Sequence, residues 1–150
     1  MYDGLNSEIT VRLYDRTDTS SFLVEKIFAT GATGDLIGGS RFLDLDSPLL
    51  LTAGFEGAIV AYGYGDGERN GNKGISSGSW TTNDGGGLIS FVGDSAYGGT
   101  GYPTTVDKGP ADRYAAGTFT YTPVPEPSTL LLLGFGLAGL GLYARKCKKA

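Results

Sequence analysis

The chain has 150 residues, enough for one domain of ordinary size, and its net charge of −4 comes from 16 acidic and 12 basic residues without any histidine. The lack of histidine removes the commonest general base and metal ligand, and the single cysteine, Cys147, excludes an intrachain disulfide. Residues 1–124 carry eight Lys and Arg against fifteen Asp and Glu, a net charge of −7, and this acidic balance disfavours nucleic acid as a partner.

Two strands are predicted near the start of the chain. Ile9 to Tyr14 alternates apolar and polar side chains, which is the period of a half-buried strand. Phe22 to Phe28 is a second strand with a mixture of side chains on both faces. The Gly-rich stretch from Gly31 to Gly39 is interpreted as a loop.

The middle of the chain predicts short strands separated by turns. Phe42 to Leu45 and Leu49 to Leu51 are expected to be strands divided by Pro48, which cannot donate a hydrogen bond to a ladder. Gly57 to Tyr62 is almost continuously apolar, as is typical of a central strand. A long polar loop is expected over residues 63–79.

The last part of the body predicts two further strands. They are Leu88 to Val92 and Tyr114 to Thr122, and the stretch from Asp94 to Pro110 between them is expected to be a loop. In the last strand the threonines share one face, while Phe119 and Tyr121 share the other.

The strand pattern and the composition together predict a fold class. The chain contains 26 Gly, nine Tyr and seven Phe, and residues before 128 show no helical periodicity. Many short strands with turn residues between them are typical of all-β folds. We therefore expect residues 1–122 to form a mainly β ectodomain, specifically an antiparallel β-sandwich.

The C-terminal end has three parts that differ in composition. Residues 123–129 contain three prolines within five positions, so this linker should be extended, polyproline-like and exposed. Residues 130–144 carry no charge and predict a short transmembrane helix of about 22 Å, against a bilayer core of ~30 Å. Residues 145–150 form a basic tail that should stay on the cytoplasmic side of a membrane. Its charged residues are Arg145, Lys146, Lys148 and Lys149.

This order of a Pro-Glu-Pro motif, a Gly-rich apolar helix and a basic end resembles the PEP-CTERM sorting signal. The motif residues are Val124, Pro125, Glu126, Pro127, Ser128 and Thr129. The resemblance implies a substrate of exosortase, a membrane protease of Gram-negative bacteria that make exopolysaccharide. The alternative interpretation is an ordinary single-span anchor that follows a proline-rich stalk.

The resemblance also implies a route and a role. The body would lie in the periplasm while the helix is in the inner membrane, and the helix and tail would then be removed or exchanged. The protein would reach the cell surface or the extracellular space, with a structural or binding role in an exopolysaccharide-associated envelope. Such a region is also called the C-terminal domain of ice-binding proteins. That name by itself implies no activity. Thr118, Thr120 and Thr122 form a single row of threonines, whereas an ice-binding face needs several stacked rows.

The beginning of the chain shows no signal peptide, because residues 1–6 contain neither a basic region nor an apolar region. In segments 41–45, 61–65, 80–87 and 109–117 the body resembles uncharacterised secreted β-sandwich proteins that carry the same sorting signal. Either the chain uses an unusual export route or its start has been lost or misassigned, and the second is the preferred interpretation. From the resemblance we then expect a signal peptide and leading strands before Met1, and an exposed sheet edge near Ile9.

One segment resembles the start of a calcium loop. Asp66, Glu68 and Asn70 place oxygen-bearing side chains at alternate positions, and Gly71 is the sixth residue. Glu at the third position and Ser77 at the twelfth depart from the calcium pattern. We interpret the segment as a polar surface loop and keep a calcium site as the alternative.

Three aromatic residues in or beside Gly-rich loops are candidates for carbohydrate binding: Trp80, Tyr97 and Tyr102. Exposed aromatic rings beside Asp and Asn often hold sugar rings, but packing over the loop backbone is the preferred interpretation. Catalysis is not expected, because the body has neither His nor Cys to activate a nucleophile. A hydrolase with paired carboxylates is the enzyme class left open, and no cofactor is expected.

Overall fold

The computed structural model describes residues 4–66, 68, 83–92, 95–108, 118–124 and 132–138. The chain divides into two compact units, Met1–Phe119 and Thr120–Ala150. The strands of the described residues all belong to the first unit, and a short helix at residues 132–138 belongs to the second.

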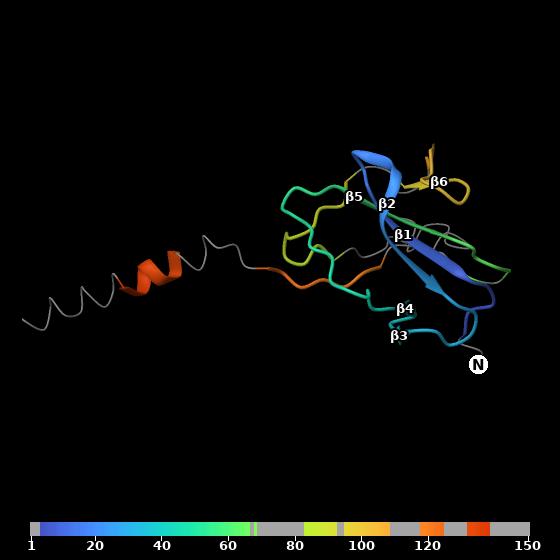
Figure 1. Ribbon diagram of the computed structural model, residues 1–150, viewed down its shortest axis with the longest axis horizontal. Coiled ribbons are helices and arrows are strands. Elements are labelled where there is room, and N and C mark those ends of the chain that lie inside the picture. Colours follow the sequence, from blue (N-terminus) through green and yellow to red (C-terminus); the bar gives the residue numbers. More distant parts are fainter. Residues whose placement is uncertain are drawn as a thin grey trace, which may run out of the picture. The chain divides into compact units, whose positions relative to one another are not determined.

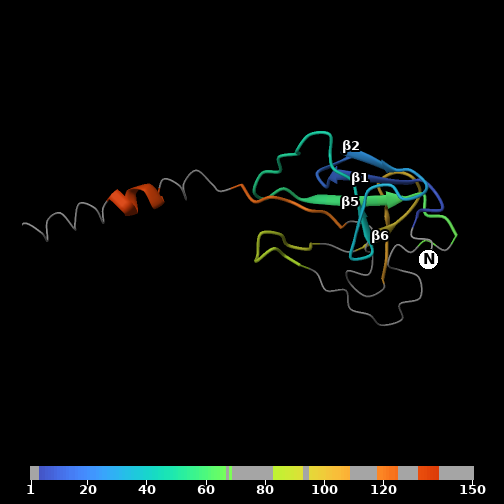
Figure 2. The same ribbon diagram turned by 90° about the horizontal axis from the view of Figure 1, so that it is seen from below.

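The main feature of the first unit is a three-stranded antiparallel sheet. Its strands are β1 (Ile9–Asp15), β2 (Asp18–Phe28) and β5 (Gly57–Tyr62), in the spatial order β2-β1-β5. Figures 1 and 2 show the three strands side by side, with β1 in the centre. β1 and β2 form a hairpin, and the Oδ1 atom of Asp15 accepts a hydrogen bond of 2.7 Å from the Thr17 N–H in its turn.

The register of the sheet decides which side chains share a face. Arg12 of β1 lies opposite Glu25 of β2 on one side and Val60 of β5 on the other. A register shift follows Leu13, and Tyr14 is then opposite Phe22. Side chains that lie directly opposite each other across an antiparallel pair point to the same face. One face of the sheet therefore gathers a cation, a carboxylate and several aromatic rings.

Two short ribbons complete the described strands. β3 (Asp35–Ile37) pairs with β4 (Ser40–Phe42), and β6 (Ala96–Tyr97) pairs with β7 (Thr105–Val106), both antiparallel. The β3–β4 turn uses Gly38 and Gly39 at φ of 58° and 88°. Positive φ at both central residues is the requirement of a tight two-residue hairpin turn.

The core of the described residues is small. Ile9, Tyr14 and Val60 are the buried apolar side chains, at 7%, 4% and 8% exposure, and no described side chain is less than 2% exposed. Ile37 and Leu50 are 60% and 73% exposed. The buried apolar contacts therefore centre on β1 and its neighbour β5.

The prediction of a mainly β, antiparallel fold is confirmed. The strand from Ile9, predicted from alternation, and the strand Gly57–Tyr62, predicted from its apolar run, lie where they were expected. β2 begins at Asp18, four residues before its predicted start. The sandwich is not established, because the described strands form one three-stranded sheet and two ribbons. β1 is paired on both sides, so the expected open edge near Ile9 is wrong.

Other strand predictions also need correction. Leu49–Leu51 and Leu88–Val92 are not strands, because a short apolar run becomes a strand only where a neighbour supplies a ladder. The expected loops at Gly31–Gly39 and Asp94–Pro110 instead contain β3, β6 and β7. The sequence identified β5 as central, but β1 holds that position. Residues 118–122 of the last predicted strand are not in a strand, and residues 114–117 lie outside the described part.

The C-terminal helix is described over residues 132–138, a length of about 10 Å. Across the described residues, no helix combines the length and the apolar character that crossing a bilayer requires. The prediction of a transmembrane helix at 130–144 is therefore not supported by the structure.

Candidate functional site

The segment that leads into the sorting motif is exposed along its whole described length. Residues 118–124 form neither helix nor strand, and all seven are exposed. Val124, the first motif residue, is 70% exposed. Motif residues 125–129 and the four basic residues of the tail lie outside the described residues. An exposed backbone without secondary structure is what a protease needs in order to bind a substrate.

The described part of the C-terminal helix is apolar on all sides. Leu132, Leu133, Phe135 and Leu137 are 77%, 60%, 70% and 63% exposed. Additional Cβ atoms at Gly134 and Gly136 would meet nothing within 4 Å. A helix that is apolar all round is not a stable surface element in water and is typical of a segment that lipid or protein covers.

A cluster of hydrogen bonds surrounds Glu68, one of the candidate calcium ligands. Its Oε1 atom accepts hydrogen bonds from the backbone N–H groups of Asn6 (2.6 Å) and Ser7 (3.1 Å). Its Oε2 atom accepts from the Ser7 hydroxyl (2.6 Å) and the Gly65 N–H (2.7 Å). The Ser7 Oγ also lies 2.6 Å from the Gly63 carbonyl oxygen. Glu68 therefore joins the N-terminal segment to the chain that follows β5.

The electrostatics of Glu68 agree with this structural role. Burial raises the pKa of the carboxyl, but the hydrogen bonds from Ser7, Gly65 and Asn6 outweigh burial and hold the pKa below its ordinary value. A carboxylate has about four lone-pair positions for acceptance. Four donors from the chain use these positions, so a calcium ion would have to displace them.

The structure describes one of the other two calcium candidates. Asp66 is exposed, and Asn70 lies outside the described residues. No cluster of three or more metal-ligating side chains occurs within the described ranges. The arrangement favours the interpretation of this segment as a surface loop with a structural carboxylate.

Arg12 is the centre of another cluster, which lies on the face of the sheet that carries Glu25 and the aromatic rings. Its Nε atom lies 2.6 Å from the Glu25 Oε2 atom. Its guanidinium carbon lies 4.5 Å from the ring centroid of Phe22 and 5.2 Å from that of Tyr62, within the range of cation–π interactions. Its Nη1 atom donates to the carbonyl oxygen of Thr100 at 3.1 Å. Arg12 thus joins the β6–β7 ribbon to the sheet.

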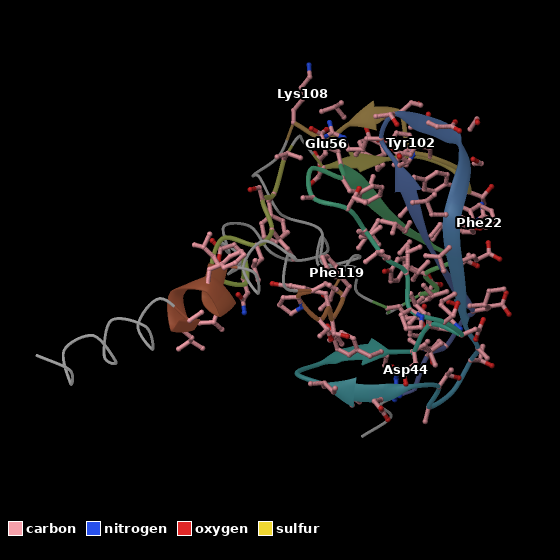
Figure 3. The ribbon with its side chains drawn as sticks, turned by 60° about the vertical axis from the view of Figure 1, so that its left-hand side comes forward. Phe22, Asp44, Glu56, Tyr102, Lys108 and Phe119 are labelled. Carbon is pink, nitrogen blue, oxygen red and sulfur yellow. The ribbon has the colours of Figure 1, made fainter. Side chains whose placement is uncertain are left out.

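Tyr102 belongs to the same cluster. Its ring meets that of the buried Tyr14 edge to face at a centroid distance of 5.4 Å, and Tyr14 meets Phe22 in the same way at 6.3 Å. Figure 3 labels Phe22 on β2 and Tyr102 in the loop between β6 and β7. The pKa of Arg12 is raised above its ordinary value, mainly by its hydrogen bond to Glu25 and to a smaller extent by one with Tyr14. This packing favours a structural role for Tyr102.

The three aromatic candidates are therefore not equivalent. Tyr102 is half-buried against Tyr14, Tyr97 on β6 is 55% exposed, and Trp80 lies outside the described residues. Among the described candidates, Tyr97 is the one whose ring is open to a ligand.

Sequence reasoning missed Ser7 and Arg12. A polar residue in the middle of an alternating strand was the signal for Arg12, but its partner Glu25 could be identified only from the strand register. No local signal points to Ser7, because its partner Glu68 is 61 residues away.

Comparison with known proteins gives one match. The family model for the PEP-CTERM protein-sorting motif matches residues 123–146, which include all six motif residues named above. No curated protein matches the chain, and no solved structure matches it. The chain carries a PEP-CTERM sorting motif, which indicates an exported protein that is directed to exosortase, a membrane enzyme.

Proposed function

We propose that this chain is a protein of the bacterial cell surface or extracellular matrix, delivered there by its C-terminal sorting motif. The observation that carries the proposal is the sorting-motif match at residues 123–146. The matched region begins within an exposed segment, since all of residues 118–124 are exposed. A processing enzyme could bind such a segment without unfolding the body.

We assign different tasks to the three C-terminal parts. Residues 124–129 form the processing region, and residues 130–144 lie in the inner membrane until they are removed. The exposed apolar side chains at 132–138 support this assignment, because water does not favour them. Residues 145–150 stay in the cytoplasm, which their four basic residues favour, and the body then lies in the periplasm before it is released.

For the body, we propose a non-catalytic, structural or binding role in an exopolysaccharide-associated envelope. The lack of histidine and the location of the only cysteine in the tail support a non-catalytic role. The net charge of −7 over residues 1–124 supports a partner other than nucleic acid. The second ligand class proposed from the sequence, calcium, is disfavoured by the four hydrogen bonds to Glu68.

Cell fractionation tests this proposal. The chain is given a signal peptide and an epitope tag before residue 4, and is produced in Gram-negative cells with and without exosortase. We expect the tag on the cell surface and in the medium only when exosortase is present, and in the inner membrane when it is absent. The same distribution in both strains would show that the motif does not direct sorting of this protein.

A further inference from the structure

We infer that the face of the sheet around Phe22, Arg12 and Glu25 binds a neutral polysaccharide. This inference rests on the proposed function and deepens it, because it names a ligand class and a binding surface for the body. All three residues lie in the first compact unit, on β1 and β2. Figure 3 labels Phe22 on β2, which is at the edge of the described sheet.

A register shift brings Phe22 to this face. Glu25 lies opposite Arg12, and in a regular ladder Phe22, three residues before Glu25, would point to the other face of the sheet. The register shift instead places Phe22 opposite Tyr14, on the same face as Glu25. Irregularities of this kind often re-aim a side chain beside a functional site. Here the re-aimed side chain is an aromatic ring.

The contacts of Phe22 leave part of this residue open to solvent. The guanidinium carbon of Arg12 lies 4.5 Å from the ring centroid, and the ring of Tyr14 meets that of Phe22 at 79°. Phe22 is nevertheless 43% exposed. Because Arg12 covers one face of the ring, we assign the exposed area to the side away from Arg12. The electron-rich face of an aromatic ring attracts polarised hydrogen atoms, such as those on the C–H face of a sugar.

The ion pair beside the ring can form hydrogen bonds with hydroxyl groups. The Arg12 Nε atom lies 2.6 Å from the Glu25 Oε2 atom, and the two side chains are 23% and 28% exposed. A carboxylate has about four acceptor positions, and a guanidinium has five N–H donors. A sugar hydroxyl both donates and accepts, so it can bind either member of the pair without separating the two charges.

Other classes of ligand fit this face less well. An apolar partner would remove water from the ion pair without replacing its hydrogen bonds, and the desolvation of paired charges is costly. An acidic polysaccharide would be repelled by Glu25 and by a body whose net charge is −7 over residues 1–124. A neutral polysaccharide meets neither obstacle, and it supplies both the C–H faces and the hydroxyl groups that this surface can bind.

Affinity electrophoresis of the full chain tests the inference. The chain is purified in a detergent without a sugar headgroup and is run in native gels that contain dextran, xylan, galactomannan or, as the acidic polymer, alginate. We expect at least one neutral polymer to retard the chain, and alginate to leave it unretarded. Phe22→Leu keeps an apolar side chain but removes the flat ring, so it should weaken the binding by about three- to ten-fold. Phe22→Trp keeps a flat ring and should still bind.

The matched control is Phe91→Leu, which changes a phenylalanine that is 52% exposed outside the strands. This variant should be retarded as strongly as wild type. A second measurement on the wild-type chain does not depend on how a variant folds: the retarding polymer should slow hydrogen exchange at residues 22–27.

Three results would overturn the inference: no retardation by any of the neutral polymers, equal retardation of wild type and Phe22→Leu, or equal losses in Phe22→Leu and Phe91→Leu. None of these results depends on exosortase. The proposed function fails separately, if exosortase does not change where the tagged chain is found.

Discussion

Ser7 and Glu68 are joined by a hydrogen bond of 2.6 Å between the serine hydroxyl and the Oε2 atom of the carboxylate, although 61 residues separate them. The same carboxylate accepts three backbone N–H groups, from Asn6, Ser7 and Gly65. The segment before β1 is thereby attached to the segment after β5. Since β1 pairs with β5, this contact joins the two strands a second time, beyond the end of the sheet where Thr10 lies opposite Tyr62.

Replacement of Glu68 by glutamine should destabilise the body. The amide nitrogen of Gln would face N–H and O–H donors that now meet a carboxylate oxygen, so we expect a loss of about 1–3 kcal/mol in the free energy of unfolding. Urea denaturation followed by circular dichroism measures this loss. The matched control is Glu8→Gln, a nearby exposed glutamate, which should change the stability by less than about 0.5 kcal/mol. Equal losses in both variants would contradict the structural role of Glu68.

The same carboxylate should contribute to the pH dependence of stability. The hydrogen bonds keep the folded-state pKa of Glu68 below its ordinary value of 4.5. The contribution is therefore fully present above about pH 4.5 and is lost as the pH falls through the lower folded-state pKa. The stability difference between wild type and Glu68→Gln should shrink between about pH 5 and pH 3 in urea titrations. A difference that stays constant over this range would exclude the linkage.

Arg12 should be far less replaceable than Arg16. Arg12→Lys keeps the charge but loses the planar group that meets Glu25, Phe22 and Tyr62 together, so the body should unfold at lower urea concentration. Arg16 pairs with Glu56 at 3.1 Å on the surface, and Arg16→Lys should have little effect. Hydrogen exchange should also rise at residues 95–108 in Arg12→Lys, because the bond to the Thr100 carbonyl is weakened. Unchanged exchange there would show that Arg12 does not hold this ribbon.

A substitution at Gly63 should be costly for two separate reasons. Gly63 has φ of 99°, and a Cβ atom there would collide with the carbonyl oxygen of Glu8. Gly39 has a similar φ of 88°, but a Cβ atom there would meet nothing within 4 Å. Both Ala variants should lose about 1–2 kcal/mol from the left-handed backbone. Gly63→Ala should lose more, which thermal unfolding of the two variants would reveal, and equal melting temperatures would argue against the close approach.

The predictable part of the fold is the part with a local signal. Alternation in Ile9–Asp15 and the apolar run Gly57–Tyr62 mark strands by themselves, but neither says which strand is central. That depends on β2 and β5, which approach β1 from opposite sides. The apolar run Leu49–Leu51 has the same local signal as a strand and forms none. In contrast, the tight turn at Gly38 and Gly39 allows a ribbon within a stretch that resembles a loop.

The candidate site also has one part that the sequence predicts and other parts that it does not. The sorting motif could be found from the sequence because its function depends on linear order: prolines, an apolar segment and basic residues. The clusters around Arg12 and Glu68 could not, because their partners lie on separate strands or loops. Asp66 and Glu68 were both candidate calcium ligands, yet Glu68 is held by four donors and Asp66 is exposed.

The intact mass of the mature protein tests the central claim most directly. The chain, with a supplied signal peptide, is produced in cells with and without exosortase and analysed by mass spectrometry. We predict loss of the C-terminal mass from a point within residues 124–129, only when exosortase is present, and no loss when Glu126→Ala is combined with Pro125→Ala and Pro127→Ala. A full-length mass in both strains would contradict the claim and would identify the C-terminal end as a plain membrane anchor.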